Sequence, residues 1–219
     1  MNDLTNLIQL TQLICLFAIP VIFAVTVHEA CHGYVANYYG DRTAKMLGRL
    51  TLNPIKHIDL IGTIIIPLTL IVLNTGLMFG WAKPVPVDPR NLKSPRRQLA
   101  IIAFAGPCSN FVMALAWAVL AKIATLIPFW FSTPLFLMAT AGIQVNFILM
   151  LLNMLPLPPL DGSKILNSFL SGRAALFYDK IEPYGFIILI LLLITGILNI
   201  ILTPLFYNSL VLIRFIFGL

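Results

Sequence analysis

Charged residues are scarce in this chain. Only 10% of its 219 residues are Asp, Glu, Lys or Arg, whereas a soluble domain usually carries about 25%. Five long runs have no charged side chain at all: 4–27, 60–82, 98–121, 123–160 and 183–213. A helix of about 20 apolar residues is long enough to cross a bilayer. The composition therefore excludes a soluble globular protein and predicts an integral membrane protein.

Cysteine and histidine are also rare, with three of each. Cys15, Cys31 and Cys108 lie in apolar segments without paired spacing, so no disulfide framework is expected. A membrane di-iron enzyme such as a desaturase is excluded because its chemistry needs many more histidines. The net charge of +6 does not indicate nucleic acid, because the basic residues collect in short loops that face anionic lipid.

The chain also lacks any polar stretch long enough for a separate soluble domain, and it has no internal repeat. Residues 1–219 are therefore expected to form one membrane domain. The first apolar run has no basic n-region and no small-residue cleavage site. It is therefore predicted to be a retained helix rather than a cleaved signal peptide.

The basic loops predict the topology. Loops 41–59, 83–97 and 163–182 carry four, five and three Lys or Arg residues, whereas loop 127–134 carries none. The positive-inside rule places the three basic loops in the cytoplasm. Segment 60–82 must then enter and leave on the same side as a re-entrant hairpin, since a simple crossing would put a basic loop outside. The amino terminus is expected outside.

The expected fold is an all-α polytopic helical bundle of about five to six transmembrane segments, with short membrane-associated strands or a re-entrant loop. The motif-bearing core helices are placed at about 13–39, 98–126 and 135–166, the third being broken by prolines after residue 155. The last apolar region is expected to break at Pro204, so that 204–219 either crosses the membrane or lies at its interface.

Two short stretches are candidates for strands, 43–52 and 80–87. In the second, Pro84 and Pro86 lack an N–H on one edge, whereas Val85 and Val87 keep theirs on the other. Such a segment can pair with another strand on one side only. A rigid proline-rich connector explains the same residues equally well.

An ionisable cluster ends the first apolar run. His28 and His32 are four residues apart, so on a helix they share one face and can bind one metal ion. Glu29 lies beside them and can take a proton from a water that the metal activates. The pattern His-Glu-x-x-His is a metalloprotease signature, and ionisable groups at membrane depth indicate function. The alternative is a pair of core histidines hydrogen-bonded between helices. Cys31 is expected to pack rather than to bind the metal.

A catalytic zinc usually has three protein ligands. Among the eight acidic residues, only Glu29 and Asp161 interrupt apolar surroundings without a basic neighbour within two residues. Asp161 is therefore favoured as the third ligand over His57, which lies in a basic loop. A helix N-cap before Gly162 is the alternative role for Asp161. One Zn²⁺ ion is the expected cofactor, although iron or cobalt would fit the same ligands.

These motifs together resemble the site-2 protease family of intramembrane zinc metalloproteases, in a compact branch without a PDZ domain. That family pairs His-Glu-x-x-His with Asn-x-x-Pro and Asp-Gly on a later helix, present here as Asn153, Pro156 and Asp161 followed by Gly162. Residues 106–110 are similar to a third family motif. The patterns of other intramembrane proteases, Gly-x-Ser-Gly and Gly-x-Gly-Asp, are absent from the sequence.

The resemblance implies a zinc metalloendopeptidase that hydrolyses peptide bonds in or near the transmembrane segments of membrane proteins. It implies that Asn153, and also Asn110, hold the substrate carbonyl or its oxyanion. It further implies that the segment with Val85 and Val87 pairs with the unwound substrate. The partners are then a transmembrane protein substrate and lipid. The location is the plasma (inner) membrane of a prokaryote, with the active site toward the cytoplasm.

Two other functions fit part of the pattern. A membrane metal transporter would use the same ligands, but it would need several sites along a path. A non-catalytic scaffold that binds membrane proteins would need no base, so the presence of Glu29 argues against it.

Overall fold

The structure is a computed structural model that describes residues 2–66, 68–69 and 80–219. Four of its helices contain a stretch long and apolar enough to cross a membrane. They are α1 (Asn2–Tyr38), α4 (Pro95–Leu126), α5 (Ser132–Asn153) and α9 (Ile197–Phe217). The described residues thus confirm an all-helical membrane protein.

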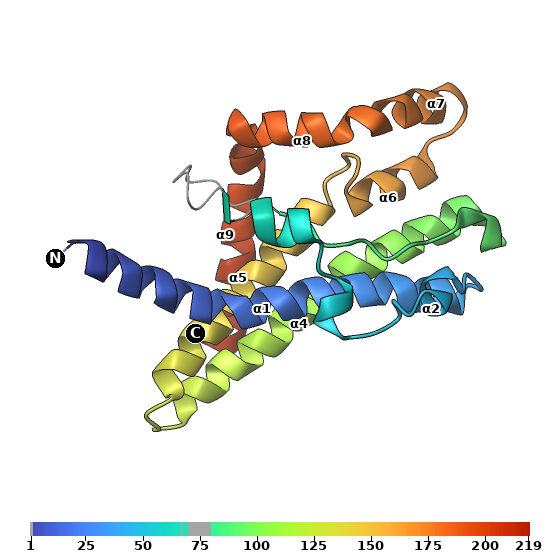
Figure 1. Cartoon of the computed structure of the whole chain (residues 1–219). Helices are drawn as coiled ribbons and strands as arrows, with labels where there is room; N and C mark the ends of the chain where they lie inside the picture. Colours follow the sequence, from blue (N-terminus) through green and yellow to red (C-terminus); the bar gives the residue numbers. More distant parts are fainter. Residues whose placement is uncertain (1, 67, 70–79) are drawn as a thin grey trace.

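Helices α1, α4 and α5 pack against one another and form the core of the fold (Figure 1). The short loop after α4 returns the chain as α5, so these two helices are antiparallel neighbours. Ala114, Ala118 and Ala121 of α4 are fully buried against Ala139 of α5. Such small side chains let helix backbones approach closely, which stabilises helix pairs inside a membrane.

The carboxyl-terminal region divides differently from the prediction. Helix α8 (Gly185–Ile194) has ten residues, a length of about 15 Å, which is too short to cross a bilayer. Gly196 then adopts a left-handed conformation with φ of 75° and separates α8 from α9. The chain therefore breaks at Gly196, which tolerates this conformation, and not at Pro204, which lies inside α9. The described part contains four candidate spans instead of five to six.

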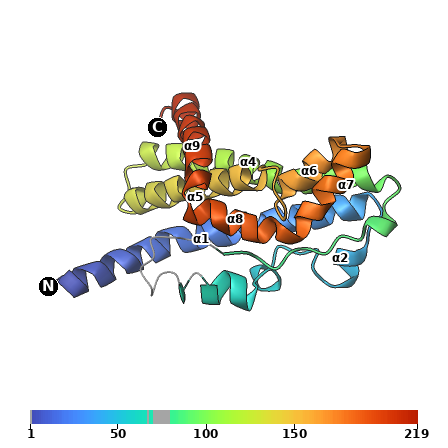
Figure 2. The ribbon, with the colours of Figure 1, turned by 90° about the horizontal axis from the view of Figure 1, so that it is seen from above.

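Two short helices connect α5 to α8, where the third core helix was predicted to end at about residue 166 and a basic loop to follow. Helix α6 (Asp161–Phe169) packs against α4, and α7 (Gly172–Ile181) leads through the short turn η4 (Glu182–Tyr184) into α8. In Figure 2, α7 and α8 follow each other as one arc along the side of the core. The Tyr178 hydroxyl donates to the Pro156 carbonyl at 2.8 Å and the Asn167 amide donates to Asp179 at 2.8 Å, so α7 is joined to the chain after α5 and to α6.

Helix α5 ends where the sequence predicts, before Pro156, Pro158 and Pro159. Residues 154–160 form a tight turn, and Gly162 lies directly against it. A Cβ at Gly162 would lie 2.4 Å from the carbonyl oxygens of Met154 and Leu155. The turn and the start of α6 therefore pack so closely that only glycine fits, and this packing fixes the position of Asp161.

No strand occurs in the residues that the structure describes, so the predicted strands are wrong. Residues 43–52 instead hold the short helix α2 (Thr43–Met46), which precedes the 3₁₀ turn η1 (Pro54–Lys56). Residues 80–88 are extended, but their backbone groups bond to other partners. The Lys83 N–H donates to the His57 carbonyl (2.9 Å), and Arg49 donates to the Pro84 carbonyl (2.7 Å). These contacts hold the segment in place without a neighbouring strand.

The two ends of the predicted re-entrant segment lie side by side. The π-helical turn η2 (Leu60–Ile65) begins this segment. The Trp81 N–H donates to the Gly62 carbonyl at 3.1 Å, and the Thr63 hydroxyl donates to the Trp81 carbonyl at 2.8 Å. Residues 67 and 70–79, which make up much of this segment, lie outside the described residues.

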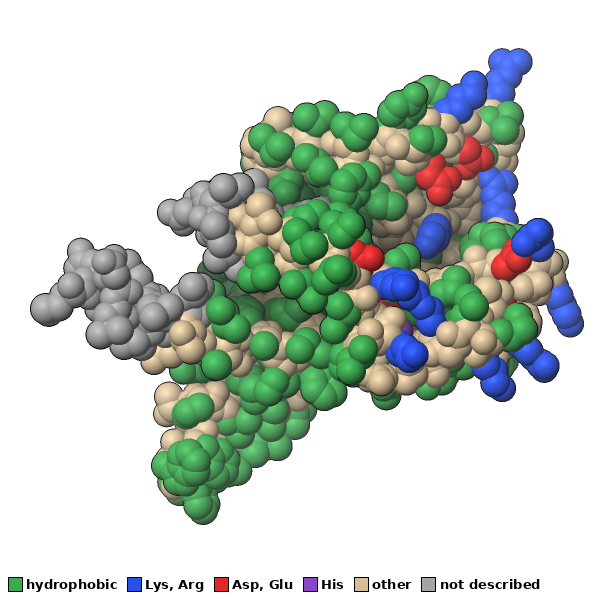
Figure 3. Space-filling model, in the orientation of Figure 1, with side chains coloured by type: hydrophobic (Ala, Val, Ile, Leu, Met, Phe, Trp, Pro, Cys, Tyr) green, Lys and Arg blue, Asp and Glu red, His purple; other side chains and the backbone are tan. Residues whose placement is uncertain are grey.

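Charge is concentrated at one end of the molecule. On the face shown in Figure 3, Lys and Arg side chains gather toward the right-hand end, and apolar side chains predominate over the rest of the described surface. This is the end where α1 finishes, α4 begins and α6 and α7 lie (Figure 1). The metal-binding candidates on α1 and α6 therefore lie toward the basic end of the bundle.

Candidate metal centre

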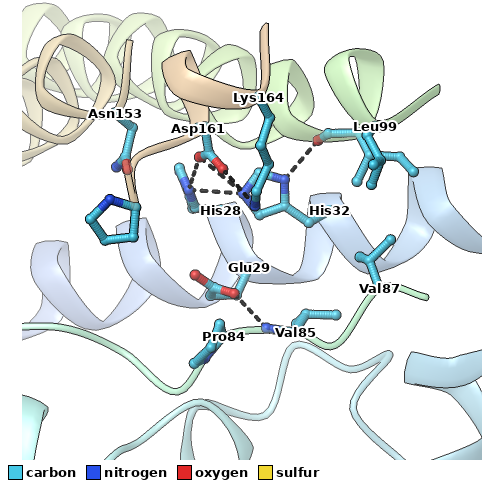
Figure 4. Close-up of a pocket in the computed structure, with 12 residues that line it drawn as sticks. His28, Glu29, His32, Pro84, Val85, Val87, Leu99, Asn153, Asp161 and Lys164 are labelled. Atoms are coloured by element: carbon cyan, nitrogen blue, oxygen red, sulfur yellow. Dashed lines mark hydrogen bonds and ion pairs between the residues drawn. The ribbon is translucent and has the colours of Figure 1, made fainter. Parts of the chain in front are cut away.

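His28, His32 and Asp161 come together at the junction of α1 and α6, and all three are buried. The two Nε2 atoms are 3.1 Å apart. The Asp161 Oδ2 atom lies 3.1 Å from His28 Nε2 and 3.2 Å from His32 Nε2. Figure 4 shows these side chains pointing toward one another from opposite sides of the site.

One face of α4 positions both imidazole rings. Ile102, Gly106 and Asn110 are four residues apart and so lie on one face of this helix. The Ile102 carbonyl oxygen lies 2.7 Å from His32 Nδ1, and the Asn110 Oδ1 atom lies 2.6 Å from His28 Nδ1. Gly106, between them, leaves room for the rings, because a Cβ there would lie 2.5 Å from His32 and 2.6 Å from His28.

These partners determine which ring nitrogens carry hydrogen. A carbonyl oxygen only accepts, so the Nδ1 atom that faces it must be the donor, and the neutral ring then presents a lone pair at Nε2. His28 and His32 therefore aim two lone pairs at the Asp161 carboxylate. Three electron-rich atoms at such short distances repel one another unless a cation lies between them.

The distances fit a zinc ion. With ligand bonds of about 2.0–2.1 Å and tetrahedral angles, zinc ligand atoms lie about 3.3 Å apart. The three edges of this triangle are 3.1, 3.1 and 3.2 Å, which are close to that separation. Two imidazoles and one carboxylate also form a donor set that catalytic zinc commonly uses. The side chains of His28, His32 and Asp161 therefore fit a zinc ion.

Glu29 lies beside the ligand triangle, on the part of α1 that faces residues 84–85 (Figure 4). Its carboxylate accepts a hydrogen bond from the Val85 N–H at 2.8 Å. Because Glu29 follows His28 directly, it adjoins the metal-binding face without being part of the ligand triangle. This is the position that a proton acceptor for a water at the site requires.

A cavity of about 150 Å³ opens beside the ligands. Four predicted site residues outside the ligand triangle line it: Glu29, Val85, Val87 and Asn153. Asn153 uses one amide hydrogen on the Leu149 carbonyl at 3.0 Å, and an amide has two such hydrogens. The arrangement thus combines a place for a cation, a carboxylate base and an amide donor around one small cavity.

Other candidates from the sequence lie elsewhere. Asn110 is fully buried behind the His28 ring and does not line the cavity. His57 is buried away from the ligand triangle, with its Nε2 atom 2.9 Å from the Thr51 carbonyl oxygen. Cys31 is half-buried and also outside the triangle.

Two polar residues near the site were not predicted from the sequence. Asn146 of α5 is fully buried and bonds to Asn110. A lone amide in an apolar run was the available signal for it. Lys164 lines the cavity, with its amine 3.8 Å from the Asp161 Oδ1 atom. The signal for Lys164 was its spacing of three residues from Asp161, which puts both on one face of a helix.

Asp41 ties the segment at the cavity to the end of α1. Its buried carboxylate accepts hydrogen bonds from Thr43, from the Asp88 N–H at 2.7 Å and from the Asn91 amide at 2.8 Å. Burial alone would raise the pKa of the Asp41 carboxyl, but these hydrogen bonds outweigh it and hold the pKa below its ordinary value. The anchored segment then carries Val85 and Val87 to the cavity.

Comparison with known proteins agrees with this site. The model of peptidase family M50 matches residues 16–129. A Bacillus subtilis (strain 168) protein named "Putative zinc metalloprotease YwhC" is 40% identical over 190 residues, which are 85% of this chain and 83% of that protein. A Mycolicibacterium smegmatis protein named "Putative zinc metalloprotease Rip2" is 29% identical over 182 residues, 81% of this chain and 66% of that protein. No solved structure matches the chain.

A polytopic helical fold with a buried His-His-Asp triangle is typical of membrane-embedded metalloproteases. This chain belongs to peptidase family M50, the site-2 protease family of zinc metalloproteases. The resemblance inferred from the motifs is thereby confirmed. Family M50 proteases are integral membrane proteins, in agreement with the four candidate membrane helices.

Proposed function

We propose that this protein is an intramembrane protease that cuts peptide bonds in or near the transmembrane segments of other membrane proteins. His28, His32 and Asp161 hold one zinc ion, and Glu29 is the catalytic base. The observation that carries the proposal is the convergence of two imidazole lone pairs and a carboxylate within 3.2 Å, next to a cavity that Glu29 also lines. Zinc, when bound, supplies the Lewis acid for carbonyl and water activation.

The residues of the chain then perform the proton transfers. Glu29 takes a proton from the attacking water as its oxygen bonds to the carbonyl carbon, and it gives that proton to the leaving amine nitrogen as the C–N bond breaks. Asn153 directs its second amide hydrogen at the carbonyl oxygen, where negative charge develops. Asn110 is assigned to a different task, because its amide hydrogens already face the Ala24 carbonyl and Asn146.

The segment at residues 80–88 is the part of the site best suited to hold an extended substrate. A helical substrate hides its backbone amides, so its chain must unwind before cleavage and then needs new hydrogen-bond partners. The Val85 N–H is occupied by Glu29. Val87 lines the cavity, and its N–H has no partner among the described residues. We assign Val87 to substrate pairing and Val85 to Glu29.

The topology supported by these contacts has three basic loops on one side. The hydrogen bonds that join Trp81 to Gly62 and Thr63 support a segment that enters and leaves on the same side. With α1, α4, α5 and α9 as the spans, loops 41–59, 83–97 and 163–182 share a side with the site. By the positive-inside rule this side is the cytoplasm, so the site faces inward. We further propose that the chain is a single domain in the plasma membrane of a prokaryote.

A metal transporter is the less favoured alternative. Transport would need further ligand clusters along a path across the bilayer. Within residues 2–66, 68–69 and 80–219, the triangle of His28, His32 and Asp161 is the only such group. Glu29 beside it, held at 2.8 Å by a backbone N–H, is an addition that transport does not require.

The test is cleavage by purified protein in proteoliposomes with zinc. Single-span peptides labelled at both ends serve as substrates for the wild type, Glu29→Gln and Glu182→Gln. Glu182 is the other glutamate of the chain and is exposed, so its substitution is the matched control. We expect cleavage by the wild type and the control, and a rate about 10²–10⁴-fold lower for Glu29→Gln. Equal cleavage by all three proteins would refute the proposal.

A further inference from the structure

Two asparagines are fully buried between α4 and α5. Asn110 of α4 and Asn146 of α5 are both 0% exposed, and the Asn110 Nδ2 donates to the Asn146 Oδ1 at 2.9 Å. Neither lines the cavity at the metal centre. Buried amides are unfavourable unless fully hydrogen-bonded, so their presence between apolar helices calls for a specific role.

Backbone carbonyls fix how both amides are turned. Asn146 places its Nδ2 at 2.8 Å from the Gly142 carbonyl, which only accepts, so its Oδ1 must face Asn110. Asn110 places its Nδ2 between that Oδ1 and the Ala24 carbonyl at 3.3 Å. The Asn110 Oδ1 atom is thereby turned to His28 Nδ1 at 2.6 Å. These hydrogen bonds therefore form one directed chain from the Gly142 carbonyl, through Asn146 and Asn110, to the His28 ring.

This order selects the tautomer of His28. An oxygen at Nδ1 requires hydrogen on Nδ1, and the neutral ring then presents its lone pair at Nε2 toward Asp161 and His32. If Asn110 turned over, its NH₂ group would face Nδ1, and the hydrogen of the ring would move to Nε2. In that state the Nε2 atom could not bind a cation.

If the two asparagines only joined α4 to α5, different contacts would be required. An amide pair that only joined α4 to α5 would need the hydrogen bond between Asn110 and Asn146, but no acceptor against the His28 Nδ1 atom. The short contact of 2.6 Å and the fixed direction favour a role toward the ring. His32 offers an internal comparison, because its Nδ1 atom faces the Ile102 backbone carbonyl, which side-chain substitutions leave in place.

We propose that Asn110 and Asn146 are positioning residues that hold His28 in the Nδ1–H tautomer and so prepare its Nε2 atom for the metal. This inference rests on the metal site of the proposed function. In this arrangement Asn110 of α4 holds the His28 ring, and Asn146 of α5 holds Asn110. It also gives the asparagine of the 106–110 motif a task that does not involve touching the substrate.

Histidine NMR tests the tautomer directly. The chain has three histidines, so metal-free protein with ¹⁵N-labelled imidazoles in detergent micelles gives three pairs of signals. In the wild type we expect the Nδ1–H pattern for His28 and His32. In Asn110→Leu we expect His28 to shift toward the Nε2–H form while His32 stays unchanged. Asn110→Asp restores an acceptor and should restore the wild-type pattern.

Zinc affinity, measured by competition with a chelator, is the second readout. Losing the partner of a metal-binding histidine typically weakens metal binding about 10–100-fold, and we expect this for Asn110→Leu. Asn146→Leu should weaken it by a smaller factor, because Asn110 keeps its place but not its fixed orientation. Asn110→Asp should lie closer to the wild type. Asn208→Leu, an exposed asparagine on α9, is the control and should have no effect.

The proposal is overturned if folded Asn110→Leu and Asn146→Leu both keep the wild-type His28 tautomer and a zinc affinity within about twofold of the wild type, a change far below the 10–100-fold range. If Asn110→Leu fails to fold, Asn146→Leu decides the question by the same two measurements, with Asn110→Asp as the control that should resemble the wild type. Neither readout depends on proteolysis. A failure of the peptide-cleavage test would therefore leave this inference standing, and the reverse also holds.

Discussion

The Val85 backbone N–H donates a hydrogen bond to the Glu29 carboxylate at 2.8 Å. Val85 lies between two prolines, and its buried side chain packs against Gly33, where a Cβ would lie 3.1 Å from the Val85 Cγ1 atom. The extended segment at residues 80–88 therefore holds Glu29 in place beside the ligands.

Replacing Val85 by proline removes this hydrogen bond. The neighbouring residues are already proline and the backbone is extended, so the substitution should preserve the path of the chain. A hydrogen bond to a charged group contributes about 1.5–3 kcal/mol, so we expect kcat to fall by about 10-fold or more with little change in KM. Steady-state cleavage of a single-span peptide measures both constants. An unchanged kcat would show that the contact does not position Glu29.

Val87→Pro gives the complementary result. Its N–H has no partner among the described residues, so its loss should leave Glu29 untouched. If this N–H pairs with the extended substrate, KM rises and kcat stays near the wild-type value. A Val87→Pro protein with unchanged KM would show that the substrate pairs elsewhere.

Gly106→Ala should damage the metal site selectively. The added Cβ would lie within 2.6 Å of both imidazole rings, and the rings are tied to the same helix through Ile102 and Asn110, so they cannot simply move away. We expect zinc affinity to fall at least about 10-fold, as for other losses of ligand positioning. Chelator competition measures this affinity.

Gly196→Ala is the matched control for that experiment. Gly196 lies between α8 and α9 with φ of 75°, a conformation that strains any residue with a side chain, and no atom lies within 4 Å of a Cβ there. We expect a lower melting temperature and an unchanged zinc affinity, because Gly196 is not part of the metal site. The opposite pattern, with Gly196→Ala losing zinc and Gly106→Ala keeping it, would contradict the assigned role of Gly106.

The Asp41 carboxylate should stabilise the fold at neutral pH and lose this effect in acid. Its folded-state pKa lies below its ordinary value, so the carboxylate stabilises the fold above the unfolded-state pKa of about 3.9, and this contribution is lost as the pH falls through the folded-state pKa. Thermal unfolding in detergent should show the wild type more stable than Asp41→Asn at pH 5–7. The gap should narrow below about pH 4. If the difference in melting temperature between the wild type and Asp41→Asn stays constant below about pH 4, the Asp41 carboxylate is not its source.

The ligand set could be predicted from the sequence because it depends on local spacing and composition. His28 and His32 share a helix face by their spacing alone, and Asp161 stands out as an isolated acid in an apolar run. The end of α5 followed from its prolines. These features are all visible without knowing which helices touch.

Contacts between distant segments could not be predicted. Asn146 lies 36 residues from Asn110, and only the packing of α4 on α5 brings them together. Alternation at residues 80–87 could not separate a strand from a rigid connector, because it also suits an extended chain whose backbone bonds to side chains such as Glu29. Helix α6 was predicted only as the end of the third core helix, and α7 was missed because its residues were assigned to a basic loop.

The most direct test of the account is zinc content per chain after dialysis against a weak chelator. We predict close to one zinc ion for the wild type and for His57→Gln, which alters the other candidate ligand. We predict almost none for Asp161→Ala, because losing a ligand itself should cost more affinity than the roughly 10–100-fold lost with a partner behind a ligand. Full zinc content in folded Asp161→Ala, or its loss in folded His57→Gln, would contradict a metal centre built from His28, His32 and Asp161.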